Sequence, residues 1–181
     1  NDPKQQEILS PTFKKKYGEV LKRADKPVFI VRVYLQDVNQ WAGFGFRHHA
    51  YAEGIAKVIS EAKHDKYDPS IWVKRDPKVS FYFRAANGKG GDEPDGPKVE
   101  PGWWTWAIAF DDNGIGHYYI SKGTNVPTQN DEVYNTSRFP APNNPHTDEI
   151  EYSYFSISGI IGGDETSKFV IDDYEVWVAK Q

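Results

Sequence analysis

The sequence predicts an all-β protein, an antiparallel β-sandwich or barrel with one or two short helices. Aromatic residues make up 15% of the 181 residues and accompany 15 Gly and 12 Pro, a composition typical of many strands and turns. About seven or eight segments alternate apolar and polar residues between turn signals, as half-buried strands do. Asn113-Gly114 joins two such segments, and this dipeptide is a strong hairpin signal because both residues tolerate positive φ.

The hairpin around Asn113-Gly114 is the centre of the predicted sheet. Its arms, 102–110 and 115–122, are rich in aromatic and β-branched residues, which favour strands. Side chains alternate along a strand, so each arm presents two different faces. The bulky face of the first arm, which we assign to the core, consists of Trp104, Trp106, Ile108 and Phe110. The smaller face, which would let a ligand approach the sheet, consists of Trp103, Thr105, Ala107 and Ala109.

The first part of the chain, 1–27, is a polar segment with one predicted helix. Ser10-Pro11 is typical of a helix start, and apolar residues then recur at helical spacing, which predicts a helix over 11–23. Residues 28–181 form the predicted β domain. Its first strand, 28–36, directs Phe29, Val31, Val33 and Leu35 to one side and Ile30, Arg32, Tyr34 and Gln36 to the other.

The remaining elements follow from the same alternation. Helical spacing returns at 55–62, and Gly- and Pro-rich loops are predicted over 87–102 and 123–148. Further strands are predicted over 41–49, 71–74, 79–86, 149–161 and 169–179. We expect Asp172-Asp173 to break the last strand.

Composition excludes several classes of function. The net charge of −4 provides no basic field for nucleic acid. The chain has no run of about 20 apolar residues, so it contains no predicted membrane span. Cysteine is absent, which excludes disulfides and thiolate chemistry. The five His show no HExxH spacing, which argues against a zinc hydrolase.

A set of polar and aromatic residues falls opposite the predicted core faces. Arg binds carboxylate and sulfate groups bidentately, so such a face suits an anionic sugar, and an indole at its rim can stack on a sugar ring. The predicted ligand-binding residues are Arg32, Tyr34, Arg47, His49, Tyr82, Arg84 and Trp103. Alternatively, the arginines pair with Glu149, Glu151 and Asp173 and only solvate the sheet. We assign Trp72 and Trp177 to the core.

Catalysis remains a second interpretation. A lyase acting on uronic acids needs a base such as His or Tyr and a cation to neutralise the carboxylate. The residues that could supply these groups are His49, His117, Tyr82, Tyr119 and Arg84, with Arg47 as an alternative cation. Glu149 and Glu151 share one side of a strand, as paired acids of a glycoside hydrolase would.

A metal site is the least specific of the predictions. Asp172 and Asp173 carry oxygen ligands of the kind that Ca²⁺ takes. The run Asp111-Asp112-Asn113 also carries side-chain oxygens of this kind, but we interpret it first as a turn.

Four segments resemble the concanavalin A-like jelly rolls of the LamG and glucanase type. They are Phe81-Tyr82-Phe83-Arg84, Trp106 to Phe110, His117 to Ile120 and the closing Phe169 to Val178. The resemblance covers about residues 28–180. It implies two antiparallel sheets, a concave face that often binds glycans and, in some members, a structural Ca²⁺. The chain lacks the E-x-D-x-x-E arrangement of the hydrolases at Asp148 to Glu151, and it lacks the motif set of the alginate lyases.

Together these observations predict an extracellular glycan-binding domain, secreted, periplasmic or on a cell surface, for a polysaccharide that carries anionic groups. A non-catalytic domain that requires no cofactor is the favoured interpretation. One alternative is a polysaccharide lyase or glycoside hydrolase on the same fold. Another is a structural or adhesive domain that contacts other domains of a larger surface protein.

Overall fold

The computed structural model describes residues 6–9, 21–22, 25–35, 46–52, 70–75, 79–84, 93–94, 96–113, 115–135, 151–160 and 169–179. These residues form twelve strands and one short 3₁₀ turn, η3. The strands pair antiparallel throughout and build two sheets. The prediction of an all-β antiparallel fold is therefore confirmed.

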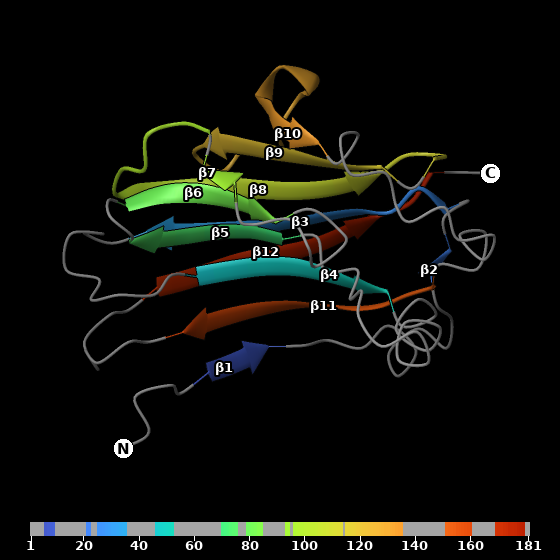
Figure 1. Cartoon of the computed structure of the whole chain (residues 1–181), viewed down its shortest axis with the longest axis horizontal. Helices are drawn as coiled ribbons and strands as arrows, with labels where there is room; N and C mark the ends of the chain where they lie inside the picture. Colours follow the sequence, from blue (N-terminus) through green and yellow to red (C-terminus); the bar gives the residue numbers. More distant parts are fainter. Residues whose placement is uncertain are drawn as a thin grey trace.

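Sheet A contains seven strands, including the first two of the chain and the late strand β11 (Figure 1). The order is β1-β11-β4-β5-β6-β7, and β2 also pairs with β11. The bounds are Gln6–Leu9 for β1, Leu21–Lys22 for β2, Phe46–Ala52 for β4, Ser70–Arg75 for β5, Val79–Arg84 for β6, Glu93–Pro94 for β7 and Glu151–Ile160 for β11. Figure 1 shows β1 at the edge of the molecule opposite to β9 and β10.

Sheet B contains five strands in the order β10-β9-β8-β3-β12. The bounds are Val28–Leu35 for β3, Gly102–Phe110 for β8, Gly116–Lys122 for β9, Glu132–Asn135 for β10 and Phe169–Trp177 for β12. The η3 turn, Gln129–Asp131, leads into β10. The predicted central hairpin is β8 and β9, and β3 lies beside it, so three strands expected from alternation form the middle of this sheet.

The core lies between the two sheets. Sheet B contributes the predicted bulky faces: Phe29, Val31, Val33, Leu35, Trp104, Trp106, Ile108 and Phe110. Sheet A contributes Ile71, Val73, Phe81 and Phe83, which are fully buried. The Phe81 ring contacts both Trp104, at 5.3 Å, and Trp106, at 5.8 Å between ring centroids, so edge-to-face aromatic pairs join the sheets. Each sheet therefore has one inner face and one outer face.

A side chain closes the turn of the central hairpin. Asp111 Oδ1 accepts hydrogen bonds from the backbone N–H of Asn113 at 2.8 Å and of Ile115 at 2.9 Å. The backbone N–H of Asp111 donates to the carbonyl of Ile115 at 3.1 Å. The predicted turn is confirmed, and the Asp side chain replaces backbone partners within it, as in an Asx-turn.

The last strand, β12, contains a bulge where the sequence predicted a break. The register to β3 shifts between Asp172 and Glu175, and Asp173 has a φ of 43°. A bulge inserts a residue and so changes which side chains face the core. Tyr174 and Val176 pack on the core, while Glu175 and Trp177 reach the outer face, where they pair with Ile30 and Val28.

Several predicted elements differ from the structure or lie outside the described residues. Leu21 and Lys22, the end of the helix predicted over 11–23, form β2 instead, and 11–20 lie outside the described residues. The helix predicted over 55–62 also lies outside them. The boundary predicted after position 27 falls between β2 of sheet A and β3 of sheet B, which both belong to the sandwich. The loops predicted over 87–102 and 123–148 contain two unpredicted strands, β7 and β10.

Candidate functional site

The seven predicted ligand-binding residues lie on two different sheets. Arg32, Tyr34 and Trp103 belong to β3 and β8 of sheet B, whereas Arg47, His49, Tyr82 and Arg84 belong to β4 and β6 of sheet A. The core-facing residues of each sheet meet in the middle, so the opposite faces point away from each other. The single face that we expected from alternation is therefore divided into two faces on opposite sides of the sandwich.

The four positions on sheet A remain close to one another. The register places Arg47 opposite Trp72 and Trp72 opposite Tyr82, in one row across three strands. His49, Ser70 and Arg84 form the next row. Because Ile71, Val73, Phe81 and Phe83 face the core, the backbone positions that alternate with them lie toward the other face of sheet A. Tyr82, in the first row, is buried there, with 8% of its surface exposed. We call these two rows the sheet A rows.

Trp72 occupies a central position of β5, between two buried residues. It lies between Ile71 and Val73, both of which are 0% exposed, so its position in β5 is on the other face. The Trp72 side chain lies outside the described part of the structure, so its assignment to the core stays a prediction.

On sheet B, Arg32 is engaged with the protein itself. Its Nε donates to the carbonyl of Thr124 at 2.8 Å, and its Nη1 pairs with the Glu175 carboxylate and lies 3.4 Å from the carbonyl of Asp173. The residue is 9% exposed. Arg32 thus joins β3 to the β12 bulge and to the segment after β9. Its Nη1 also lies 3.9 Å from the Asp173 carboxylate. These contacts agree with the alternative interpretation, in which the arginine pairs with carboxylates of the protein.

Glu175 connects this arginine to an aromatic side chain. One oxygen accepts from Arg32, and the other accepts from the indole Nε1 of Trp177 at 2.8 Å. The hydrogen bond from Arg32 lowers the pKa of the Glu175 carboxyl below its ordinary value, and the Trp177 hydrogen bond acts in the same direction. Trp177 is 47% exposed, so its assignment to the core was wrong.

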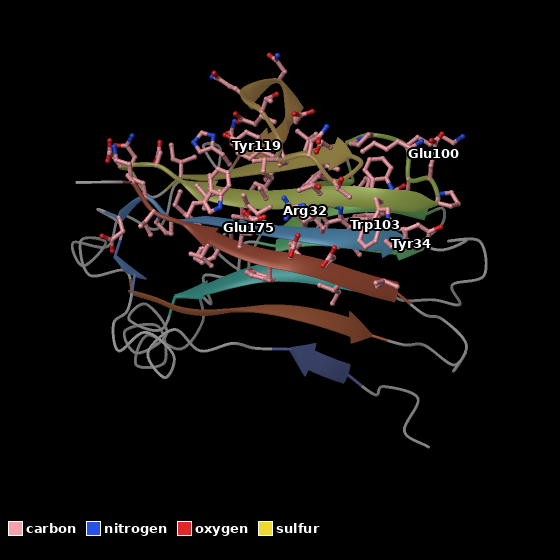
Figure 2. All side chains as sticks on the ribbon, turned by 180° about the vertical axis from the view of Figure 1, so that it is seen from behind. Arg32, Tyr34, Glu100, Trp103, Tyr119 and Glu175 are labelled. Carbon is pink, nitrogen blue, oxygen red and sulfur yellow. The ribbon has the colours of Figure 1, made fainter. Side chains whose placement is uncertain are left out.

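Tyr34 and Trp103 form a pair at the other end of the same face. Their ring centroids are 5.4 Å apart and their planes are inclined by 66°, an edge-to-face contact. Figure 2 shows both residues toward one end of sheet B, with Arg32 nearer its middle and Glu175 and Tyr119 farther along the sheet. Trp103 thus packs against Tyr34 on this face of sheet B.

A groove of about 460 Å³ lies on the outer face of sheet B, beyond Arg32. Its floor is apolar and consists of Val28, Ile30, Ala107 and Ala109. The β9 side carries His117 and Tyr119, the β12 side carries Trp177, and the segment 126–129 together with Glu132 completes the rim. The expectation that the small face of the 102–110 arm leaves room above the sheet agrees with this geometry. We call it the sheet B groove.

The polar side of the groove is organised by a carboxylate. Glu132 Oε1 accepts from Asn135 Nδ2 at 3.0 Å and lies 3.1 Å from His117 Nδ1. The other ring nitrogen of His117 is 3.7 Å from Asp111 Oδ2. Burial raises the pKa of the Tyr119 hydroxyl, and the charge of Glu132 raises it further. Sequence reasoning missed Glu132 because it lies in a segment predicted to be a loop.

The predicted lyase residues are divided in the same way as the ligand-binding residues. His117 and Tyr119 line the sheet B groove, whereas His49, Tyr82 and Arg84 belong to sheet A. The described residues that line the groove include no Lys or Arg, so none of them could neutralise a uronate carboxylate there. Among the predicted lyase residues, the cation Arg84 therefore belongs to the same sheet as His49 and Tyr82 and not to the groove.

The described surroundings of Asp172 and Asp173 do not fit a calcium ion. Asp172 Oδ1 accepts the backbone N–H of Asp173 at 3.0 Å, and the Asp173 carboxylate faces the Arg32 guanidinium. Within the described residues, no group of three or more His, Asp or Glu side chains could hold a metal ion. A cation beside Arg32 would be repelled, and we therefore derive no role for calcium.

Comparisons with known proteins identify the fold. The chain is similar to a tetrameric galectin from the ball sponge Cinachyrella sp., with a TM-score of 0.54 and 8% identity over 94% of this chain and 99% of that chain. It is similar to the carbohydrate recognition domain of Emp47p, with a TM-score of 0.53 and 9% identity over 96% of this chain and 78% of that one. No protein-family model and no curated protein matches the sequence.

A third similar structure is the GH43 protein BlXynB from Bacillus licheniformis, with a TM-score of 0.55 and 9% identity. The match covers 86% of this chain but only 28% of that chain. The chain has the jelly-roll, concanavalin A-like β-sandwich fold that the sequence resemblance implied. In the part of the chain that the structure describes, no helix is long and apolar enough to span a membrane.

Proposed function

We propose that the protein is a glycan-binding β-sandwich domain, and that the sheet A rows bind a polysaccharide with anionic groups. The observation that carries the proposal is the register of β4, β5 and β6, which brings Arg47, His49, Trp72, Tyr82 and Arg84 into two adjacent rows. The similarity to a galectin and to a carbohydrate recognition domain supports a sugar ligand, although a shared fold alone does not define function.

The chemistry of these positions suits a charged polysaccharide. Arg47 and Arg84 lie two strands apart and in neighbouring rows, so their backbones are roughly 12 Å apart. Two guanidinium groups at this spacing can each bind one carboxylate or sulfate along a polymer. Trp72, placed between them, supplies an indole on which a sugar ring can stack. We further propose that the domain acts outside the cell, where such polysaccharides occur.

Affinity electrophoresis tests this proposal directly. The probes are alginate, pectate and glucuronan as anionic polysaccharides and a neutral glucan for comparison. We expect anionic polysaccharides to retard the protein, and Arg47→Ala, Arg84→Ala and Trp72→Ala to abolish the retardation. The matched control is Lys122→Ala, which removes an exposed positive charge on sheet B and should leave the retardation intact. Added salt should weaken binding.

The same samples separate the alternatives. Ultraviolet absorbance that rises during incubation would reveal unsaturated uronates and so favour a lyase, and loss of that signal in Arg84→Ala would place the activity on sheet A. Absence of retardation by every polysaccharide would overturn the proposal and leave a structural or adhesive domain as the better interpretation. Equal loss in Lys122→Ala would show that binding depends only on overall charge.

A further inference from the structure

The sheet B groove is distinct from the sheet A rows and has a different chemistry. It crosses β12, β3, β8 and β9 at one end of the outer face of sheet B. Trp177 is paired with Val28, Val28 with Ala109, and Ala109 with His117. Three strand spacings separate Trp177 from His117, so the groove is roughly 14 Å wide between backbones. A volume of about 460 Å³ is typical of a small-ligand site.

The rim of the groove is held in place by hydrogen bonds. Thr128 donates from its backbone N–H and from its hydroxyl to Asp131 Oδ2, at 2.7 and 2.8 Å. Thr105 Oγ1 donates to the carbonyl of Gly123 at 2.9 Å, and Arg32 holds the next residue, Thr124. The segment 123–128 is therefore bound to sheet B at Gly123 and Thr124 and to the η3 turn at Thr128. A fixed rim lowers the entropic cost of ligand binding.

The aromatic wall is fixed in the same manner. The Trp177 indole donates to Glu175, whose second oxygen is held by Arg32. The indole is nevertheless 47% exposed and borders the groove. An oriented, half-exposed indole beside an apolar floor offers a surface for the C–H face of a flat ring.

The charged side chains that line the groove determine which class of ligand it can bind. Among the described residues that line it, Glu132 is the only carboxylate, and no Lys or Arg is present. The hydrogen bonds of Glu132 to described residues use Oε1, so Oε2 can accept from a ligand hydroxyl. Thr128 and Gln129 add further polar groups. An anionic ligand would be repelled by Glu132, which distinguishes this groove from the sheet A rows.

We propose that the sheet B groove is a second ligand site, which binds an uncharged sugar. A pyranoside has an apolar C–H face that stacks on Trp177 and the Ala107–Ala109 floor. Its hydroxyl groups donate to Glu132 and bind the polar rim at Thr128 and Gln129. The protein would then hold an anionic chain on one face and a neutral sugar on the other.

Nuclear magnetic resonance titration tests the second site independently of the first. The probes are cellobiose, lactose and maltose, with glucuronic acid as the anionic comparison. We expect a neutral sugar to shift the methyl signals of Ala107 and Ala109 and the indole N–H signal of Trp177. Ala109→Phe fills the floor and should weaken binding about ten-fold or more, as should Trp177→Ala. Val170→Phe adds the same ring to β12 outside the groove and should leave binding unchanged.

The outcomes separate this proposal from the proposed function. Arg47→Ala and Arg84→Ala should not alter the titration with neutral sugars, whatever they do to anionic polysaccharides. The second site is overturned if no neutral sugar shifts the groove signals, if glucuronic acid shifts them more strongly, or if Val170→Phe weakens binding as much as Ala109→Phe. Because Trp177 is an exposed residue near the end of an edge strand, Trp177→Ala keeps the test valid if Ala109→Phe fails to fold.

Discussion

Arg32 of β3 forms an ion pair with Glu175 of β12 across the outer face of sheet B. The arginine side chain is 11% exposed and the glutamate side chain 29%. The same guanidinium lies near the carbonyl of Asp173, within the bulge, and binds the carbonyl of Thr124. One side chain thus supports the edge strand, the bulge that turns Trp177 outward and the rim of the sheet B groove.

We predict that Arg32→Met lowers the free energy of unfolding by about 2 kcal/mol. The substitution keeps most of the side-chain volume but leaves the Glu175 carboxylate and the carbonyl of Thr124 without their partner. Urea denaturation followed by tryptophan fluorescence measures the change.

The matched control is Lys122→Met, which removes the pair between Lys122 and Glu100. This lysine side chain is 59% exposed, and exposed ion pairs contribute little to stability. If the two variants are equally stable, Arg32 does not have the structural role assigned to it here.

A pH dependence follows from Glu175. Its pKa is lowered in the folded protein, chiefly by the hydrogen bond from Arg32, so folding favours the charged carboxylate. This contribution to stability is complete above the ordinary pKa of 4.5 and is lost as the pH falls through the lower, folded-state pKa. We expect Glu175→Gln to be less stable than the original chain at neutral pH and to converge with it in acid. Urea denaturation from about pH 7 to about pH 3 measures the difference, and a constant difference would contradict the prediction.

Alternation along single strands predicted the inner faces of β3 and β8 correctly. Phe29, Val31, Trp104 and Trp106 are all buried, because the side-chain period of a strand is two. The Asn113-Gly114 turn likewise depends only on neighbouring residues. These features are local, so the sequence contains enough information to predict them.

The division of the predicted site could not be predicted in that way. Alternation shows that Arg32 and Arg47 point away from a core, but not which sheet each strand joins, because sheet membership depends on long-range pairing. Trp177 was misassigned because the bulge after Asp172 reverses the faces of the residues that follow. Glu132 lies within 123–148, a segment whose Asn and Pro content predicted a loop and so concealed β10.

The turn of the central hairpin gives a third prediction. Asp111→Ala removes the acceptor of the backbone N–H groups of Asn113 and Ile115, and we expect it to cost about 1–2 kcal/mol of unfolding free energy. Asp112→Ala is the control, since this neighbour forms an exposed ion pair with Lys26 and should cost little. Thermal denaturation of both variants distinguishes them, and an equal loss would argue against the Asx-turn as the stabilising feature.

Gly96 and Gly123 have the same positive φ but different surroundings. Substituting each by Ala therefore distinguishes the cost of a steric clash from the cost of positive φ. Gly96 and Gly123 both have a φ of +100°, but a Cβ at Gly96 would lie 3.2 Å from Cζ of Phe83, whereas no atom lies within 4 Å of one at Gly123. Phe83 is fully buried and its ring contacts Tyr118 and Tyr134, so the ring has little room to move.

We therefore expect Gly123→Ala to cost roughly 1 kcal/mol of unfolding free energy, the penalty for positive φ alone. Gly96→Ala should cost roughly 1 kcal/mol more, because the added methyl group also displaces Phe83. Urea denaturation measures both values. Double variants with Phe83→Leu test the cause, since the smaller side chain should relieve the extra cost at Gly96 and leave the cost at Gly123 unchanged. If Phe83→Leu affects both glycine variants alike, the contact between Gly96 and the ring is not the source of the difference.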